Sequence, residues 1–447
     1  DGFQDHILSI NSYLIKDNSL IYITDSYNKE GNDLVERIVK TEMGSGEKEI
    51  IHEGGNWWEL VCLEDNLYAV GLSSRMDWPK TPSLYSVTTN GDTEDLLKEL
   101  DRDVVDVKKI DKEIYITYED SGKVCLGIFK DSKIETLSDN KETITSISGD
   151  SSGIYAIINN QTCPGEVYKL SDTHKRISEF NKAFKDKVSL IDYEYRRINT
   201  GDSEIDTWGL LVDPDAPTLL NVHGGPAAQY GFTFFDEFQV YAEAGFNVIA
   251  CNPRGSSGRG DMFIKGVKGE YWGVNDVHDV VTSFDKMINE MGITNPKFGI
   301  MGGSYGGFMT SWVIGNYPEK FESAVVERAL LNWTTMVSTS DIGYSFPSMY
   351  LEETIENNPE LYEEKSPISY ANNIIAPTLI IHSENDFRCP MEQAEQLFSI
   401  LKRRNIESAL LRFPGEGHEL SRSGKPKHRD IRFNHIINWH KKYLFTD

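Results

Sequence analysis

The first 185 or so residues alternate short apolar and polar positions in a way that predicts β-strands and turns, with no helical period. A polar turn followed by an apolar-aromatic strand recurs four times, each time with a tyrosine: Tyr22, Tyr68, Tyr115 and Tyr155. These tyrosines are separated by 46, 47 and 40 residues. A period of roughly 40 to 50 residues with about four strands per unit is typical of β-propeller blades. We therefore predict about four blades over residues 1–185, with a generic β-sandwich as the alternative.

The pattern changes from about Asp192 onward. Short apolar strands are predicted at 218–223, 247–251, 298–301, 323–326, 378–381 and 409–413. Between them, apolar residues recur at helical spacing, most clearly from Val277 to Met291. Strands that alternate with helices predict a mostly parallel sheet covered on both faces. We assign this α/β domain to residues 186–447 and expect the hinge between the domains in the polar stretch 181–200.

A candidate nucleophile follows the strand at 298–301. Residues 302–307 read Gly-Gly-Ser-Tyr-Gly-Gly, with Ser304 at the third position, and a helical segment follows them. A bare G-x-S-x-G motif should occur by chance in roughly one chain in seven of this length, so the motif alone carries little weight. A strand, then the motif, then a helix is the geometry of a nucleophile elbow. In this context the sequence predicts that Ser304 is an activated serine.

A serine hydroxyl needs a base, and the base needs an orienting carboxylate. In an α/β-hydrolase these groups follow the serine in the order Asp, His, each just past the end of a later strand. Asp386 follows the strand at 378–381, and His418 follows the strand at 409–413, directly after Gly415-Glu416-Gly417. Glu384 competes with Asp386 for the role of the acid, while His382 precedes that loop and is interpreted as a packing residue.

Donors for an oxyanion are also expected. His223-Gly224-Gly225-Pro226 follows the strand at 218–222, where an HGGG-like loop belongs in this fold. Its glycines allow a backbone N–H to approach the substrate oxygen, and the N–H of Tyr305 would supply the second donor. Four elements in the right order on the right strand ends predict an α/β-hydrolase. Together with the repeats of residues 1–185, the predicted fold is an α/β-hydrolase preceded by an all-β propeller domain whose set of blades is incomplete.

Six segments also match a known family: HGGP at His223, NPRGSSGRG from Asn252, WGVNDVHD from Trp272, GGSYGGFMT from Gly302, HSENDFRCP from His382 and EGHELSRSGKP from Glu416. With these segments, the carboxyl-terminal 260 residues resemble the catalytic domain of the prolyl oligopeptidase family, in particular its acylaminoacyl peptidase branch.

The resemblance implies a serine peptidase acting on short peptides through an acyl-enzyme. It implies that Ser304, Asp386 and His418 form a triad, that Tyr305 and Gly225 form the oxyanion hole, and that Arg388 holds a substrate carbonyl. Propellers of this family usually have seven or eight blades, whereas we count about four. Association into a homo-oligomer is common in the family and is left open here.

The composition of the chain limits the classes of binding partner and the cellular location that we expect. The net charge of −25 argues against nucleic acid, because phosphate would be repelled. No stretch approaches the roughly 18 to 20 apolar residues that a membrane helix needs, so no membrane partner is expected. Five scattered cysteines suit a reducing cytoplasm better than a disulfide scaffold. The chain begins at Asp1 without a methionine, so we expect that upstream blades or a targeting segment have been removed or left out.

Other chemistries find no support in the sequence. H-E-x-x-H is not met, because Arg422 stands where the second histidine would be, and no Cys/His cluster has zinc spacing. The glycine-rich stretch 255–260 lacks the lysine of a P-loop and the spacing of a dinucleotide motif. We therefore expect no metal and no organic cofactor. The alternatives that stay open are a carboxylesterase or amidase with the same triad, and a catalytically silent propeller binding protein.

Overall fold

The computed structural model describes residues 9–27, 34–88, 90–170 and 174–445, which fall into two compact units. The first unit comprises Asp1–Lys187, Gly231–Phe234 and Ser257–Ile264, and the second comprises Val188–Tyr230, Phe235–Ser256 and Lys265–Asp447. The boundary at Lys187 falls inside the polar stretch 181–200. That stretch also holds a short helix and an edge strand, which its sequence pattern did not indicate.

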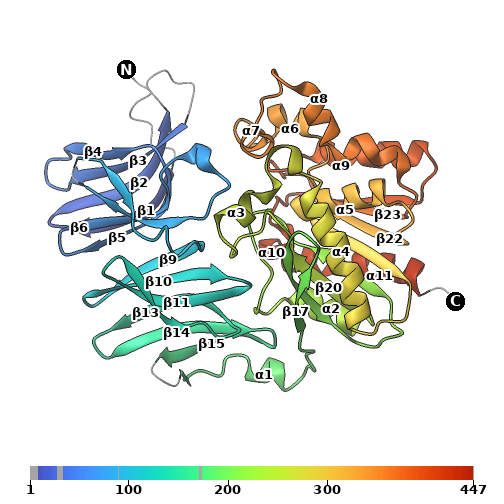
Figure 1. The fold of residues 1–447 in the computed structure, drawn as a ribbon, viewed down its shortest axis with the longest axis horizontal. Helices are drawn as coiled ribbons and strands as arrows, with labels where there is room; N and C mark the ends of the chain where they lie inside the picture. The colour runs from blue at the N-terminus through green and yellow to red at the C-terminus, as the bar shows by residue number, and fades with distance from the viewer. Residues whose placement is uncertain (1–8, 28–33, 89, 171–173, 446–447) are drawn as a thin grey trace. The chain divides into compact units, whose positions relative to one another are not determined.

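The first unit consists, within its described residues, of four groups of four consecutive strands (Figure 1). The strands are β1 (Ser9–Lys16), β2 (Ser19–Tyr27), β3 (Leu34–Glu42), β4 (Lys48–Glu53), β5 (Asn56–Leu63), β6 (Asn66–Leu72), β7 (Ser83–Val87), β8 (Thr93–Asp95), β9 (Val104–Ile110), β10 (Glu113–Asp120), β11 (Lys123–Lys130), β12 (Lys133–Ser138), β13 (Thr143–Asp150), β14 (Gly153–Asn160), β15 (Cys163–Leu170) and β16 (Lys175–Arg176). Strands pair antiparallel within each group. The third and fourth groups form one eight-stranded sheet through a single parallel pair, Val124 with Thr143.

The four repeated tyrosines occupy equivalent places in these groups. Tyr22, Tyr68, Tyr115 and Tyr155 lie in β2, β6, β10 and β14, which is the second strand of each group. Tyr22 and Tyr115 are buried, and Tyr115 packs in an apolar cluster with Leu126 and Ile147. The 40–50-residue period of the sequence is therefore the repeat of one four-stranded unit.

The second unit is organised around one eight-stranded sheet in the order β17-β18-β20-β19-β21-β22-β23-β24. Its strands are β17 (Glu194–Asn199), β18 (Glu204–Leu210), β19 (Thr218–Val222), β20 (Asn247–Asn252), β21 (Phe298–Gly303), β22 (Ser323–Glu327), β23 (Thr378–Ser383) and β24 (Ser408–Phe413). From β20 to β24 neighbouring strands run parallel, so their carboxyl ends meet at one edge. β17 and β18 extend the sheet antiparallel at the other side.

Helices connect these strands and pack against the sheet (Figure 1). The α-helices are α1 (Lys182–Lys185), α2 (Asp236–Glu243), α3 (Asp261–Ile264), α4 (Asn275–Glu290), α5 (Tyr305–Asn316), α6 (Trp333–Thr339), α7 (Phe346–Leu351), α8 (Pro359–Glu364), α9 (Met391–Arg403), α10 (Leu420–Ser423) and α11 (Pro426–Leu444), of which α1 and α3 belong to the first unit. The 3₁₀ helices are η1 (Arg75–Asp77), η2 (Lys265–Val267), η3 (Gly269–Tyr271) and η4 (Pro367–Asn373). The helix predicted from residue 277 begins at Asn275, and its residues Val277, Val280 and Phe284 are buried as the apolar period predicted.

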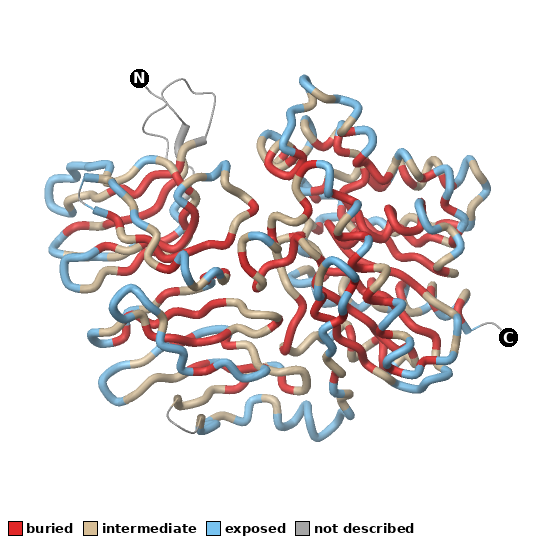
Figure 2. Tube along the Cα trace, viewed as in Figure 1, coloured by how far each residue is buried: buried red, intermediate tan, exposed pale blue. Residues whose placement is uncertain are grey.

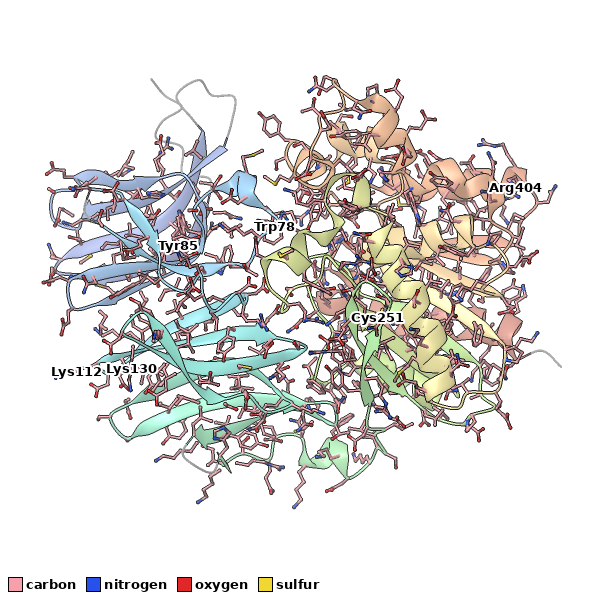
Figure 3. The ribbon with its side chains drawn as sticks, in the orientation of Figure 1. Trp78, Tyr85, Lys112, Lys130, Cys251 and Arg404 are labelled. Atoms are coloured by element: carbon pink, nitrogen blue, oxygen red, sulfur yellow. The ribbon has the colours of Figure 1, made fainter. Side chains whose placement is uncertain are left out.

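Burial follows the expected pattern for a sheet covered by helices, since every residue of β19, β20, β22 and β23 is buried (Figure 2). Cys251, labelled in Figure 3, lies in β20, and all five cysteines are free thiols. In the part of the chain that the structure describes, no helix is both long enough and apolar enough to cross a membrane.

Candidate active site

Ser304 lies on a sharp turn between β21 and α5. Its backbone has φ 62° and ψ −121°, a conformation that residues with a side chain rarely adopt. The N–H of Ser304 donates to the carbonyl oxygen of Glu327, 3.0 Å away at the end of β22. Gly306 is needed because a Cβ there would lie 2.1 Å from the carbonyl oxygen of Val222. The neighbouring strands thus hold Ser304 in the strained turn of a nucleophile elbow.

Asp386 and His418 are joined by a hydrogen bond. Nδ1 of His418 lies 2.8 Å from Oδ2 of Asp386, and the Asp386 side chain is fully buried. The other carboxylate oxygen, Oδ1, accepts the backbone N–H groups of Arg388 at 3.0 Å and Cys389 at 2.9 Å. These bonds fix the carboxylate, so the imidazole can present Nε2 away from the acid, as a general base must.

The two competing residues of that loop have other contacts. Glu384 is partly exposed and forms an ion pair with Arg412 at 3.2 Å. His382 is buried, and its Nε2 lies 2.6 Å from the carbonyl oxygen of Cys389 and 3.6 Å from Asp386. Burial lowers the pKa of His382 and outweighs the opposing effect of Asp386, so its ring is neutral near pH 7. The geometry therefore offers Asp386, rather than Glu384, to His418.

The loop after β19 begins with a neutral histidine. Burial lowers the pKa of His223 to about 4. Its ring nitrogens lie 2.7 Å from the carbonyl oxygen of Gly224 and 3.0 Å from the hydroxyl of Ser256. His223 thus ties its own loop to the loop after β20, while Gly225 stays on the surface of the cavity that contains Ser304. Its position suits a backbone donor to an oxyanion.

Tyr305, whose N–H is the other expected donor, has a partner that the sequence did not reveal. Its hydroxyl donates to Oδ2 of Asp276 at 2.7 Å, and both side chains are buried. Burial raises the pKa of Asp276 to about 7, with a further increase from Asp279, although the Tyr305 and Val277 hydrogen bonds lower it. A polar residue in the first turn of an amphipathic helix gives no hint of such a contact. The only sequence signal was its place in the WGVNDVHD segment.

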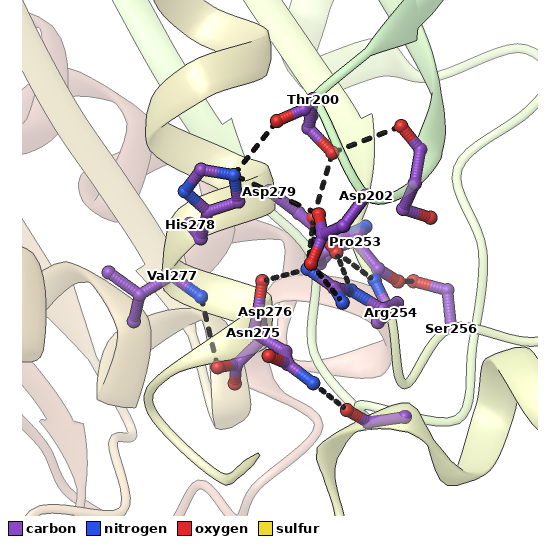
Figure 4. Close-up of polar contacts among 12 residues, drawn as sticks. Thr200, Asp202, Pro253, Arg254, Ser256, Asn275, Asp276, Val277, His278 and Asp279 are labelled. Carbon is purple, nitrogen blue, oxygen red and sulfur yellow. Dashed lines mark hydrogen bonds and ion pairs between the residues drawn. The ribbon is translucent and has the colours of Figure 1, made fainter.

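Three residues beyond Asp276 in α4, Asp279 takes part in a polar network with Arg254, Asp202 and Thr200 (Figure 4). Arg254 donates from Nε to Oδ2 of Asp279 at 2.8 Å and from Nη2 to Oδ1 at 2.9 Å, and its Nη1 reaches Asp202 at 3.0 Å. The hydroxyl of Thr200 lies 3.2 Å from Oδ1 of Asp279. The bidentate pair between Arg254 and Asp279 joins the loop after β20 to α4 and so fixes the helix that carries Asp276.

A cavity of about 600 Å³ in the second unit brings the candidate residues together. Ser304, Tyr305, Gly225, Arg388 and His418 line it, and Asp386 lies buried behind His418. An apolar half is lined by Trp272, Leu330, Met336, Ile342 and Phe346. A charged half is lined by Asp236, Glu237, Glu327, Arg328, Glu419, Arg422, Arg429 and Arg432.

The guanidinium of Arg388 is engaged at the cavity edge. Its Nε donates to Oδ1 of Asp341 at 2.7 Å, and its Nη2 lies 3.2 Å from Oδ2. The pair is half exposed, so exchange of Asp341 for a substrate group would cost little. The structure therefore places Arg388 at the cavity, as predicted from the sequence, but its guanidinium is already paired with Asp341.

A buried ion pair lies beneath the elbow and was also missed by sequence reasoning. Arg432 of α11 donates to both carboxylate oxygens of Glu327, at 2.5 and 2.7 Å, and reaches Glu237 at 3.0 Å. Arg432 and Glu327 are both almost fully buried. Glu327 is also the residue whose carbonyl accepts the N–H of Ser304, so this pair stabilises the strand end behind the candidate nucleophile.

Within the described ranges, no group of three or more His, Cys, Asp or Glu side chains is arranged to hold a metal ion.

Comparisons with known proteins find a matching family model and several similar curated proteins. The model of the prolyl oligopeptidase family matches residues 232–446. The uncharacterized peptidase YuxL of Bacillus subtilis is 39% identical over 309 residues, which is 67% of this chain and 47% of that protein. Acylamino-acid-releasing enzyme 1 of Oryza sativa subsp. japonica is 31% identical over 237 residues, 51% of this chain and 30% of the relative. The chain thus spans about half or less of these curated relatives' length.

A solved structure is similar across both units. Uncomplexed Pyrococcus horikoshii acylaminoacyl peptidase matches with a TM-score of 0.89 and 25% sequence identity, covering 97% of this chain and 70% of that one. The predicted fold class, blade-like β-sheets followed by an α/β-hydrolase domain, is confirmed.

Proposed function

We propose that this chain is a serine peptidase of the prolyl oligopeptidase family, whose model matches residues 232–446, and that it hydrolyses short peptides through an acyl-enzyme. One observation carries the proposal. His418 is bound to the buried carboxylate of Asp386 at 2.8 Å and lines the same cavity as Ser304 on its strained turn. This arrangement supplies a nucleophile, its base and the group that orients the base.

The proposed reaction uses these groups in sequence. His418 takes the proton of Ser304, which attacks the peptide carbonyl, and Asp386 stabilises the imidazolium. The N–H groups of Gly225 and Tyr305 donate to the oxyanion, a contribution of about 10²–10³ in rate per donor in other serine hydrolases. His418 then gives its proton to the leaving amine, and water repeats the cycle on the acyl-enzyme.

The substrate class follows from the relatives and from the cavity. The rice relative is named for the release of acylated amino acids, and the Pyrococcus protein is an acylaminoacyl peptidase. We propose amino-terminally acylated short peptides, with an apolar side chain in the half lined by Leu330, Met336 and Phe346. Arg388 would exchange Asp341 for a substrate carbonyl. A carboxylesterase or amidase with the same triad is the second candidate, since the same groups cleave small esters.

Two further proposals concern the setting of the enzyme. The five free thiols support a cytoplasmic location. Self-association into a homo-oligomer is proposed from the family resemblance, and light scattering of the purified chain tests it.

A fluorophosphonate probe, which labels activated serines, tests the chemistry. We expect labelling of the wild type, none of Ser304→Ala, and a loss on the order of 10⁴–10⁶ in turnover for that variant. Ser338→Ala, which removes an exposed hydroxyl in α6, is the matched control. Labelling that survives Ser304→Ala would refute the nucleophile.

Substrates then separate the two enzyme classes. The wild type is compared on acetyl-dipeptides, unblocked tripeptides and a nitrophenyl ester. Cleavage of the acetylated peptides supports the peptidase. Ester hydrolysis with no cleavage of any peptide establishes the carboxylesterase instead.

A further inference from the structure

The charged half of the cavity holds four arginines and four carboxylates, and their pairing is uneven. Arg432 binds Glu327 and Glu237, Arg429 lies 3.1 Å from Asp236, and Arg422 binds Glu419. Three arginines therefore occupy all four carboxylates. The fourth arginine, Arg328, has no hydrogen bond or ion pair from its side chain to any residue within the described ranges.

Arg328 is poorly solvated for a cation. Its Nε is enclosed by protein without an acceptor, and burial lowers the pKa of its guanidinium, although Glu327 opposes this. Its backbone has a positive φ of 34°, which turns the residue out of the path of β22. Arg328 is only partly exposed, and its enclosed Nε has no acceptor in the protein, so a guanidinium in this state at the wall of a cavity indicates a ligand of opposite charge.

Two observations place the guanidinium of Arg328 relative to the reacting groups. It lies against Gly303, the residue before Ser304, because a Cβ at that glycine would be 2.7 Å from Cζ of Arg328. The pKa of Glu419, the residue after His418, is lowered mainly by its bonds to Arg422 and also by the charge of Arg328. Arg328 therefore lies against the nucleophile turn and close enough to Glu419 for its charge to act on that carboxylate.

This position corresponds to the leaving side of the reaction. His418 gives its proton to the leaving amine, so the leaving group departs beside His418 and the residues that follow it. Glu419, Ser421 and Arg422 line this part of the cavity together with Arg328. A leaving group of one or two residues ends in a free carboxylate only about 3–7 Å beyond its amine, since a residue spans at most ~3.6 Å.

We propose that Arg328 binds the free α-carboxylate of a short leaving group, and that it thereby selects peptides that end one or two residues beyond the scissile bond. The inference rests on the proposed peptidase function. A guanidinium matches a carboxylate with two parallel hydrogen bonds, and the carboxylate supplies the charge that Arg328 lacks within the protein.

The test compares each substrate with its own amide. The ratio of kcat/KM for acetyl-Ala-Ala to that for acetyl-Ala-Ala-amide is measured in the wild type, Arg328→Met, Arg328→Lys and Arg412→Met. Arg412 is a matched control because it pairs with Glu384 and Glu395 and does not line the cavity. We expect the wild type to prefer the free acid by about 10- to 100-fold. Arg328→Met should abolish the preference, Arg328→Lys should retain part of it, and Arg412→Met should keep it.

A pair of aryl esters makes the test independent of peptide cleavage. Acetoxybenzoate releases a leaving group with a carboxylate, and acetoxybenzamide releases one without it. If no peptide is cleaved, the peptidase proposal fails, whereas an acid-over-amide preference on the esters that Arg328→Met removes still supports the role of Arg328. Because the wild-type preference is itself a prediction, the proposal stays testable even if Arg328→Met does not fold.

A second pair of substrates, acetyl-Glu-Ala-amide and acetyl-Gln-Ala-amide, tests whether Arg328 instead binds a side-chain carboxylate on the acyl side of the scissile bond. These differ only in the charge of the side chain on the acyl side. A wild type without preference for the free acid overturns the proposal. So does an equal loss on acid and amide in Arg328→Met, or an effect of Arg328 confined to the glutamyl substrate.

Discussion

Replacing Asp386 by asparagine is the sharpest test of the proposed triad, because the structure dictates how the amide must lie. In the wild type, Oδ1 accepts the N–H groups of Arg388 and Cys389 at 3.0 and 2.9 Å, while Oδ2 faces Nδ1 of His418 at 2.8 Å. The oxygen of the new amide has to take the Oδ1 position, since its NH₂ group there would face two donors. The NH₂ group then donates to Nδ1 of His418, and the ring must carry its proton on Nε2, where it cannot accept the proton of Ser304.

The magnitude follows from the cost of the opposite amide orientation. Turning the amide leaves two buried N–H groups without an acceptor, at about 1–3 kcal/mol each. A total of about 2–6 kcal/mol, at tenfold per ~1.4 kcal/mol, reduces the competent population by about 30- to 10⁴-fold. We expect turnover and the rate of fluorophosphonate labelling to fall by this factor, with an unfolding midpoint close to that of the wild type.

Glu384→Gln is the matched control, because it removes the competing carboxylate of the same loop. Glu384 is partly exposed and pairs with Arg412, so its loss should change both rates by less than about threefold. The reasoning is refuted if Asp386→Asn keeps more than a tenth of the wild-type rate, or if Glu384→Gln loses as much as Asp386→Asn.

Three further variants probe the supports of the site. Arg432→Met should lower the free energy of unfolding by about 3–5 kcal/mol in a denaturant titration, because Glu327 would be buried without its partner, and a loss below about 1 kcal/mol would contradict this. Gly306→Ala places a Cβ 2.1 Å from the carbonyl oxygen of Val222, so it should destabilise the chain by at least about 1–3 kcal/mol and abolish probe labelling, and wild-type labelling would contradict it. Asp276 has its pKa raised from 3.8 to about 7, so the stability it contributes is complete below about pH 4 and is lost as pH rises through 7. Asp276→Asn should therefore gain stability relative to the wild type between pH 5 and pH 8, by at most about 3 kcal/mol, and an equal difference at both pH values in denaturant titrations would refute it.

The helices, turns and strand ends of this molecule could be predicted where they depend on residues that are close together in the sequence. The apolar period from Val277 to Met291 predicted the helix that the structure shows as α4. The glycine-flanked serine between a strand and a helix predicted a sharp turn, in which a Cβ at position 306 would clash with the carbonyl oxygen of Val222. Parallel strands place their carboxyl ends at one edge, so Asp386 and His418, each after a strand, could be expected to meet.

Contacts between distant segments could not be predicted in this way. Asp276 and Tyr305 are 29 residues apart, and Glu327 and Arg432 are 105 apart. Nothing in the helical period distinguishes a buried carboxylate in a first turn from a solvated one. Likewise, the segments Gly231–Phe234 and Ser257–Ile264 belong to the first unit, although in sequence they lie among the strands of the second. Packing and desolvation in the folded chain decide which of these distant residues come into contact.

The end of β22 shows how these missed contacts bear on function. Glu327 and Arg328 are consecutive, yet only Glu327 has a partner of opposite charge bound to its side chain. The guanidinium of Arg432 donates to the two carboxylate oxygens of Glu327 at 2.5 and 2.7 Å. The same Glu327 holds the N–H of Ser304 through its carbonyl, so its position cannot change without moving the elbow. Arg328, turned away by its positive φ, is consequently fixed against Gly303 with its charge unpaired. One strand end therefore both holds the nucleophile turn and presents a cation to the cavity, which couples the geometry of catalysis to the recognition of a carboxylate.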